Sequence, residues 1–210
     1  MDVKSVIILA GVLNPLTRMF KINDNMKANN LKEKYRIMDT KQFFRTIRRM
    51  GLEVVEKFPD LDNLIIAGIK TRGVYLARYI KDVVQEETGM DIPVGEIDIS
   101  FYRDDLSLID EVPVVRGTRL GENIDDRKIL VVDDVLFTGR TVRAALDAIF
   151  DFGRPKEVKL AVLIDRGWRE LPICADIVGK KITTTLSEVV KVKVKEVDGA
   201  DEVWMLERVN

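Results

Sequence analysis

The segment at residues 129–141 constrains the fold of this chain more than any other, and it reads ILVVDDVLFTGRT. Its first four residues are apolar, as in a strand buried on both faces, and the carboxylates of Asp133 and Asp134 follow directly. A turn of small residues then leads into a helix, which is predicted from apolar residues at helical spacing, namely Val142, Ala145, Leu146 and Ile149. Strand, turn and helix in this order predict a unit of an α/β fold.

The turn at residues 137–141 has the chemistry of an anion site. Its backbone N–H groups, two threonine hydroxyls and the start of the helix can donate to a phosphate, and Gly139 lets the backbone approach closely. Asp133 and Asp134 are expected at the strand's end, facing a cleft, because two adjacent carboxylates cannot both enter a dry core. There they can accept hydrogen bonds from vicinal sugar hydroxyls, so the segment describes a site for a ribose 5-phosphate. The alternative is a plain surface turn that the two carboxylates open.

Composition excludes several other kinds of site. No stretch reads GxxxxGK[ST], so ATP binding through a Walker phosphate loop has no support. The chain has no histidine and one cysteine, Cys174, which excludes an internal disulfide, the usual zinc ligands and His-based triads. A net charge of −1 gives no overall attraction to nucleic acid, so any RNA contact needs a local basic patch. The 210 residues, 46% of them hydrophobic and 33% charged, predict one folded domain in the cytoplasm.

Residues 1–30 are predicted to be a poorly ordered N-terminal extension ahead of a domain at residues 31–210. The apolar run at residues 6–13 is too short to span a bilayer and lacks a small-residue cleavage site, so neither a membrane span nor a signal peptide is expected. A loosely packed tail is favoured for this run, and a short ordered strand is the alternative. The polar stretch at residues 21–33 predicts a linker, with the folded body starting near Lys34.

Helical and strand patterns alternate through the body of the chain. Asp39 and Gln42 can cap a helix whose core-facing stripe is Phe43, Ile47, Met50, Val54 and Phe58. Residues 64–69 read as a buried strand, and the next helix carries Leu76, Ile80 and Val84. Further strands are predicted at residues 97–102, at residues 158–164 and where Val190, Val192 and Val194 alternate with lysines.

Strands that alternate with helices over residues 64–164 predict a mostly parallel sheet with right-handed crossovers and helices on both faces. Ligands should gather at the carboxyl ends of the strands, so the turns after Ile69, Tyr102, Val132 and Ile164 are expected around one crevice.

Two of these turns carry cations. The turn GIKTRG at residues 68–73 suits a pyrophosphate, because Lys70 and Arg72 can neutralise it while Thr71 and the backbone donate hydrogen bonds. Read alone, this turn can also be a solvated basic turn. Residues 101–120 leave a strand through a charged stretch and predict a lid whose Arg103 reaches the diphosphate. An ordinary surface hairpin is the alternative.

The order of residues in 129–141 resembles the phosphoribosyl-pyrophosphate (PRPP) signature of type I phosphoribosyltransferases. Over about residues 31–210 the chain further resembles the bifunctional members that regulate pyrimidine operons, through the segments GIKTRGVYLA, VGEIDISFYRDDL, ILVVDDVLFTGRT, LAVLIDRGWRELPICAD and VGKKITTTLSE. The resemblance implies an α/β fold with a mostly parallel twisted sheet, helices on both faces and a small hood. It implies uracil phosphoribosyltransferase activity, in which uracil and PRPP give UMP and diphosphate with Mg²⁺. It also implies UMP-dependent binding to operon leader mRNA, hence transcription attenuation, and a homodimer or larger homo-oligomer.

The resemblance also assigns roles to residues of this sequence. Substrate binding falls to Lys70, Thr71, Arg72, Arg103, Asp133, Asp134, Val135, Leu136, Phe137, Thr138, Gly139, Arg140, Thr141, Arg166 and Val190. The catalytic candidates are Asp133, Asp134 and Arg103, and Asp133 is the candidate ligand of Mg²⁺, partly through PRPP and water. Family members have a cis peptide at the position that matches Lys70 and Thr71.

The residues favour uracil over other bases. Enzymes for 6-oxopurines place an acidic residue where this chain has Phe137, dedicated uracil enzymes show Asp-Pro in place of the acid pair, and orotate enzymes show Glu-Asp. The tripeptide DRG at residues 165–167 agrees with the bifunctional members, although Asp165 and Arg166 can also form a simple ion pair at a strand end. The alternatives are a phosphoribosyltransferase for another nucleobase, a nucleotide-sensing RNA-binding regulator with little enzymatic activity, and a catalytically silent domain.

RNA binding is predicted on a separate face. Arg45, Arg48 and Arg49 lie at helical spacing opposite the apolar stripe and form a basic face that can hold phosphates, or one that is merely solvated. Leu52 and Trp168 stand where the RNA-binding regulators commonly carry histidine. Trp168 can stack on a base or pack at a subunit contact.

Overall fold

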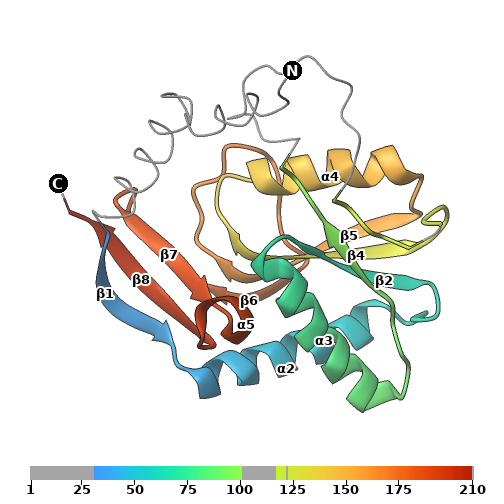
Figure 1. Cartoon of the computed structure of the whole chain (residues 1–210), viewed down its shortest axis with the longest axis horizontal. Helices are drawn as coiled ribbons and strands as arrows, with labels where there is room; N and C mark the ends of the chain where they lie inside the picture. Colours follow the sequence, from blue (N-terminus) through green and yellow to red (C-terminus); the bar gives the residue numbers. More distant parts are fainter. Residues whose placement is uncertain (1–30, 101–116, 122, 210) are drawn as a thin grey trace, which may run out of the picture.

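A computed structural model describes residues 31–100, 117–121 and 123–209. The described residues form a five-stranded sheet and a three-stranded sheet (Figure 1). The predicted extension at residues 1–30 and most of the predicted lid, with Arg103, lie outside the described residues. None of the described helices is long and apolar enough to cross a membrane.

The larger sheet is parallel throughout and has the strand order β3-β2-β4-β5-β6. Its strands are β2 (Leu64–Ile69), β3 (Val94–Ile97), β4 (Lys128–Leu136), β5 (Glu157–Asp165) and β6 (Ile177–Lys181). All six residues of β2 are buried, as a strand covered on both faces requires. The predicted strands at 64–69 and 158–164 are therefore confirmed, as is the parallel sheet.

Helices cover both faces of this sheet (Figure 1). Alternate strand residues face opposite sides: Leu64, Ile66 and Leu130 pack in the core under α2 (Thr40–Lys57) and α3 (Arg72–Thr88). Ile65 and Ile129 pack in a second core under α4 (Arg140–Phe152). The predicted stripe of α2 is buried, and its start is the expected capping box, in which Gln42 N–H donates to Asp39 Oδ1 at 2.7 Å.

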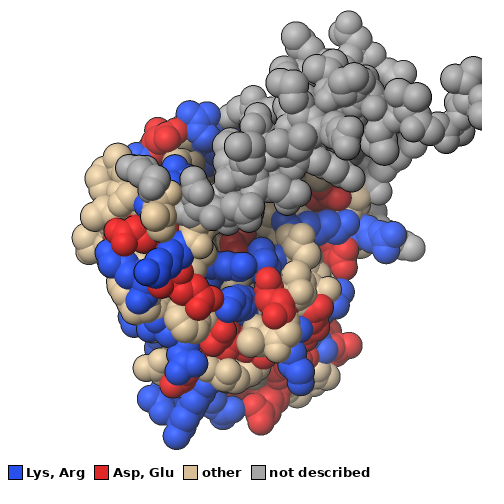
Figure 2. All heavy atoms as spheres, turned by 60° about the vertical axis from the view of Figure 1, so that its left-hand side comes forward, with Lys and Arg blue, Asp and Glu red and all other residues tan. Residues whose placement is uncertain are grey.

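The smaller sheet is antiparallel, has the order β1-β8-β7 and forms the predicted hood beside the main sheet (Figure 1). It consists of β1 (Leu31–Met38), β7 (Glu188–Lys193) and β8 (Glu202–Arg208), with the short helix α5 (Lys195–Asp198) between β7 and β8. Ion pairs join its strands, among them Lys34 with Glu188 at 2.9 Å and Lys193 with Glu202 at 3.2 Å. In Figure 2, basic and acidic side chains are accordingly interspersed over the visible face.

The linker prediction is wrong at its end, because β1 begins at Leu31 and not near Lys34. Only Ile37 and Met38 of this strand are buried, so its sequence shows little hydrophobic pattern. The strand is defined by its ladder with β8, which starts at the pair Leu31 and Arg208.

The strand predicted at residues 97–102 is also misplaced, since β3 spans Val94–Ile97. β3 pairs with the last four residues of β2, and the ladder ends at the pair Ile69 and Ile97 because β2 ends there. Beyond it, Asp98 Oδ1 accepts the N–H of Ser100 at 3.1 Å, which turns the chain out of the sheet.

Candidate active site

The sequence predicted that the acid pair lies at the end of its strand. This prediction is wrong, because Asp133 and Asp134 lie within β4. The ladder to β5 continues past both residues as far as the pair Leu136 and Asp165. Asp133 is only 6% exposed, and its Oδ1 accepts the N–H of Asp134, which is partly buried, at 2.9 Å. Burial raises the pKa of Asp133 well above its ordinary value, and the charge of Asp134 raises it further. Burial also raises the pKa of Asp134, although the nearby Arg72 lowers it.

The turn after β4 consists of Phe137, Thr138 and Gly139, and α4 starts directly after it. Gly139 is the N-cap and has φ +95°, a left-handed conformation that favours glycine. A Cβ at this position would also lie 3.3 Å from Cβ of Leu171. Leu171 is therefore packed closely against the turn at Gly139.

The turn after β2 brings a second helix to the acid pair. It contains Lys70 and Thr71, joined by a cis peptide as the resemblance implies, and α3 starts at Arg72. Gly73 lies so close to β4 that a Cβ there would be 2.4 Å from the carbonyl oxygen of Val132, which immediately precedes Asp133. The N-terminus of α3 is thus packed against the strand that carries the acids.

The two helices at this site begin differently from α2. Among the described residues, the N-cap residues of α3 and α4, Thr71 and Gly139, make no side-chain cap hydrogen bond, whereas α2 has its complete capping box. At α4 the Thr138 hydroxyl, just before the N-cap, accepts the N–H of Arg140 at 3.3 Å. The first N–H groups of a helix have no partner within the helix and are met by side chains, water or a ligand. Because an anion is stabilised at such a terminus, the starts of α3 and α4 suit two phosphate groups.

The two cations of the first turn are engaged by carboxylates of the chain. Lys70 Nζ donates to the carbonyl of Gly117 at 2.8 Å and lies 3.5 Å from Asp98 Oδ2. Arg72 donates from Nε and Nη2 to both carboxylate oxygens of Asp198 in α5, at 2.9 and 2.8 Å. Their contact with a diphosphate stays a prediction, and Arg72 is the one that also lies near Asp134.

Arg166, just after β5, is packed against the turn that follows β4. Its guanidinium carbon lies 4.1 Å from the centre of the Phe137 ring, and Nη2 donates to the carbonyl of Thr185 at 3.1 Å. The residue is 5% exposed, and its Nε has no partner among the described residues. Burial lowers the pKa of Arg166, while the charge of Glu188 raises it. Because buried donors are normally hydrogen-bonded, this Nε is a group that water or a ligand can satisfy.

Arg169 is a residue of the site that the sequence reasoning missed. Its Nη1 donates to the carbonyls of Phe137 at 2.7 Å and Leu136 at 3.3 Å, and its Nη2 pairs with Asp165. The simple ion pair considered for Asp165 and Arg166 is therefore wrong, because Asp165 bonds to Arg169. Arg169 therefore satisfies carbonyl groups at the turn, and the N–H groups of the turn are left for a ligand.

Most of the predicted site residues come together. The turn at residues 137–141, the turn at Thr71 and Arg72, and Arg166 lie at the carboxyl ends of β4, β2 and β5, and Asp133 and Asp134 lie within β4, near its carboxyl end. Val190 is in β7 of the hood and is partly buried, and it packs against the same core as Val135 of β4.

The acidic residues do not form a complete metal cage. In the described ranges, no group of three or more His, Cys, Asp or Glu side chains is placed to hold a metal ion. The buried oxygens of Asp133 are of the hard type that Mg²⁺ prefers, and Mg²⁺ commonly takes the rest of its ligands from water and substrate phosphates. The donor set therefore fits Mg²⁺ bound mainly through substrate and water.

Comparison with known proteins agrees with this geometry. Residues 35–197 match the family model of the phosphoribosyl transferase domain. The Bifunctional protein PyrR of Clostridioides difficile is 50% identical over 175 residues, which cover 83% of this chain and 99% of that protein. The Bifunctional protein PyrR of Acetivibrio thermocellus is 52% identical over 80% of this chain and 92% of its own length. The chain belongs to the PyrR family.

Solved structures place the PyrR family chain in the phosphoribosyltransferase fold. The hypoxanthine phosphoribosyltransferase of Trypanosoma cruzi superposes with a TM-score of 0.64 and covers 84% of this chain and 98% of that one. The enzyme of the same name from Staphylococcus aureus gives a TM-score of 0.62, with 86% and 95% covered. Identities of 15% and 18% show the fold alone. The predicted fold class, including the hood, is confirmed.

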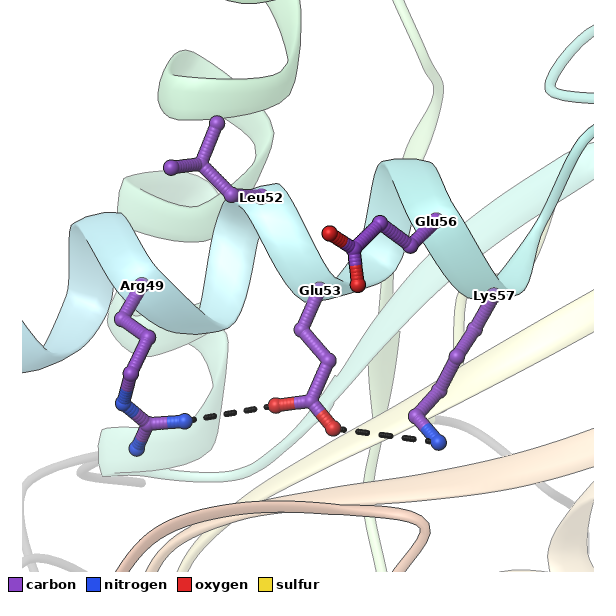
Figure 3. Close-up of a pocket in the computed structure, with 5 residues that line it drawn as sticks. All are labelled: Arg49, Leu52, Glu53, Glu56 and Lys57. Atoms are coloured by element: carbon purple, nitrogen blue, oxygen red, sulfur yellow. Dashed lines mark hydrogen bonds and ion pairs between the residues drawn. The ribbon is translucent and has the colours of Figure 1, made fainter.

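The basic face predicted for RNA in this PyrR family member lies on the exposed side of α2. Arg45, Arg48 and Arg49 are all exposed, but Arg48 pairs with Glu86 at 2.9 Å. Arg49 donates to the carbonyl of Val178 in β6 at 2.8 Å and pairs with Glu53, which also binds Lys57 (Figure 3). Arg49, Leu52, Glu53, Glu56 and Lys57 line a shallow hollow of about 410 Å³ along this helix. The face therefore mixes basic and acidic side chains.

Proposed function

We propose that the chain transfers the 5-phosphoribosyl group of PRPP to uracil and releases diphosphate, so that UMP is formed. The observation that carries this proposal is the placement of an acid pair in β4, next to the starts of α3 and α4, whose N-cap residues make no side-chain cap hydrogen bond in the described part of the chain. PRPP has a phosphate on C5, a diphosphate on C1 and a vicinal diol between them. A diol between two phosphates matches acids between two anion sites.

In this proposal each part of the site has one role. The turn of Thr138 and Gly139 at α4 holds the 5-phosphate, and Asp133 and Asp134 accept hydrogen bonds from the ribose hydroxyls. The turn of Thr71 and Arg72 at α3 holds the diphosphate, with Arg103 closing over it. Arg166 and Val190 contact the remainder of the nucleotide.

The reaction needs no covalent enzyme intermediate. The bond from C1 to the diphosphate oxygen breaks largely before the uracil nitrogen attacks, and positive charge spreads over C1 and the ring oxygen. The bond between C1 and nitrogen then forms, and the proton of that nitrogen passes to the released diphosphate or to solvent. The protein contributes by orienting the two substrates, excluding water and stabilising the leaving diphosphate with Arg72 and Arg103. Mg²⁺, held by Asp133 through PRPP and water, would neutralise charge on the phosphates.

Release of diphosphate tests this function. Purified protein with Mg²⁺ and PRPP is expected to release diphosphate with uracil but not with hypoxanthine or orotate. A preference for either of the other bases contradicts the uracil proposal and supports an enzyme for another nucleobase. No release with any base leaves the nucleotide-sensing regulator.

RNA regulation is a second function that membership in the PyrR family supports. We propose that the chain binds the leader mRNA of a pyrimidine operon when UMP occupies the site, and that it acts in the cytoplasm as a homodimer or larger homo-oligomer. A gel shift with the chain's own operon leader RNA is expected only when UMP is added. A gel shift that is the same with and without UMP contradicts the proposal that UMP controls RNA binding. Light scattering measures the oligomeric state.

A further inference from the structure

Helix α3 is joined to the hood by two side chains on one of its faces. The guanidinium of Arg72 donates two hydrogen bonds, of 2.9 and 2.8 Å, to the carboxylate of Asp198. Seven residues later, the Tyr79 hydroxyl lies 2.7 Å from Glu196 Oε2 and 3.1 Å from Asp201 Oδ1. Seven residues make about two helical turns, so both contacts lie on the same face. We call these five residues the hood clamp.

Asp198 is itself held in place. Its Oδ2 accepts the N–H of Val194 at 3.1 Å, and its side chain is 14% exposed against 30% for Arg72. The hydrogen bond from Arg72 lowers the pKa of Asp198, and the same bond raises the pKa of Arg72. The pair is therefore ionic and bidentate, the arrangement that fixes a guanidinium plane most tightly.

The guanidinium of Arg72 lies near one residue of the acid pair, Asp134. A guanidinium has five N–H donors, and Asp198 takes one on Nε and one on Nη2. Three donors are left over, and the charge of Arg72 acts on Asp134 in β4. The guanidinium thus lies between an acid of the hood and an acid of the predicted ribose site.

We propose that Asp198 is a positioning residue for phosphoribosyl transfer, which holds the Arg72 fork so that its remaining donors meet the diphosphate of PRPP. The inference rests on the proposed function and adds a residue of the hood to it. A guanidinium already oriented by a carboxylate loses less conformational freedom when the diphosphate arrives. Without Asp198, Arg72 must be ordered by the substrate itself.

The test compares the two contacts of the hood clamp, that of Arg72 with Asp198 and that of Tyr79 with Glu196 and Asp201. Asp198→Asn keeps the shape of the side chain and removes its charge, and KM for PRPP is expected to rise about tenfold, the scale of one lost charged hydrogen bond. KM for uracil and kcat should change by less than about twofold. Tyr79→Phe is the matched control, because it removes the other hood contact of the same helix face and leaves Arg72 untouched. It should lower the melting temperature without changing KM for PRPP.

Asp198→Glu supplies the conservative variant and is expected to recover part of the PRPP affinity. If Asp198→Asn does not fold, Asp198→Ser replaces it, and a KM for PRPP equal to that of the unsubstituted chain then contradicts the proposal. An unchanged KM in Asp198→Asn, or the same rise in Tyr79→Phe, overturns it as well.

Failure of the proposed function is recognised separately. If the unsubstituted chain forms no UMP, that function fails, and calorimetry with inorganic diphosphate and Mg²⁺ decides the role of Asp198. Weaker diphosphate binding by Asp198→Asn but not by Tyr79→Phe supports the positioning role. Equal binding by all three proteins contradicts it.

Discussion

The guanidinium of Arg166 lies 4.1 Å from the centre of the Phe137 ring, and this contact joins the segment after β5 to the turn after β4. A cation over an aromatic face is stabilised by the ring quadrupole, by about 0.5 to 2 kcal/mol. Phe137 stands at the position where enzymes for 6-oxopurines carry an acidic residue. A carboxylate there would be placed to pair with Arg166, whereas the aromatic ring takes no hydrogen bond in its plane and Nε of Arg166 has no partner among the described residues.

Phe137→Leu is expected to reduce kcat/KM for uracil by up to about tenfold and the free energy of unfolding by about 1 kcal/mol, because leucine lacks the quadrupole. Steady-state kinetics and urea unfolding measure the two effects. Phe150→Leu is the control, since Phe150 lies on α4 and is 46% exposed. Equal effects of the two changes would contradict the role of the contact.

Asp134→Asn is expected to reduce UMP synthesis about tenfold or more, the scale of lost charged hydrogen bonds to the ribose. The substitution keeps the size of the side chain and removes its charge. The rate of diphosphate release under saturating uracil measures it. Unchanged turnover would remove Asp134 from the mechanism.

Asp133→Asn is expected to have opposite effects on stability and on activity. The Asp133 side chain is buried next to a second carboxylate, so asparagine should raise the free energy of unfolding of the ligand-free protein by about 1 to 3 kcal/mol. Urea unfolding at pH 8 measures this gain, and UMP synthesis should fall. Asp134→Asn should stabilise less, because Arg72 already offsets that charge. A destabilised Asp133→Asn would contradict this account of burial.

Gly139→Ala is expected to destabilise the protein by about 1 to 2 kcal/mol, the cost of a left-handed residue with a Cβ, and to raise KM for PRPP at least about tenfold. Gly89, which caps the C-terminus of α3 with φ +74°, gives the matched control. Gly89→Ala should show a similar loss of stability with an unchanged KM. If both variants raise KM equally, the effect comes from lost stability and not from the turn.

Acid should unfold the hood through two carboxylates. Hydrogen bonds lower the pKa of Asp198, chiefly from Arg72, and that of Glu188, chiefly from the Thr185 N–H. A carboxyl group whose pKa is lower in the folded than in the unfolded protein stabilises the fold at pH values above its unfolded pKa, which is 3.8 for Asp198 and 4.5 for Glu188. This stabilisation is lost as the pH falls through the pKa of the folded state. The free energy of unfolding should therefore drop below about pH 4.5, and less steeply in Asp198→Asn. An equally steep drop would exclude Asp198 from acid unfolding.

Local patterns were enough to predict β2, β4, β5 and the α2 cap, but they misplaced β3 and did not predict β6. Asp39 and Gln42 are three residues apart, β2 is a continuous apolar run and residues 160–164 of β5 are apolar, so neighbouring residues carry the signal. β1 was not predicted as a strand because six of its eight residues are not buried and the strand is defined by pairing with β8 at the other end of the chain.

Within the site, the types of residue could be predicted but not their partners. The acids, the glycine turn and the cations follow one another in the sequence, and the structure brings them to one edge of the sheet. The bond of Arg72 to Asp198 joins residues 126 positions apart, and Arg169 reaches the carbonyl of Phe137 across 32 positions. Such bonds arise only after the strands and the hood have assembled.

The N-termini of α3 and α4 have a consequence for handling the protein. Their N-cap residues do not supply the side-chain hydrogen bond that Asp39 supplies at α2, so an anion in solution can stabilise these two helix starts by binding there. Phosphate or sulfate in a buffer should therefore act as a weak surrogate substrate, protecting the enzyme on storage and competing with PRPP in an assay. The choice of buffer thus becomes part of measuring its activity.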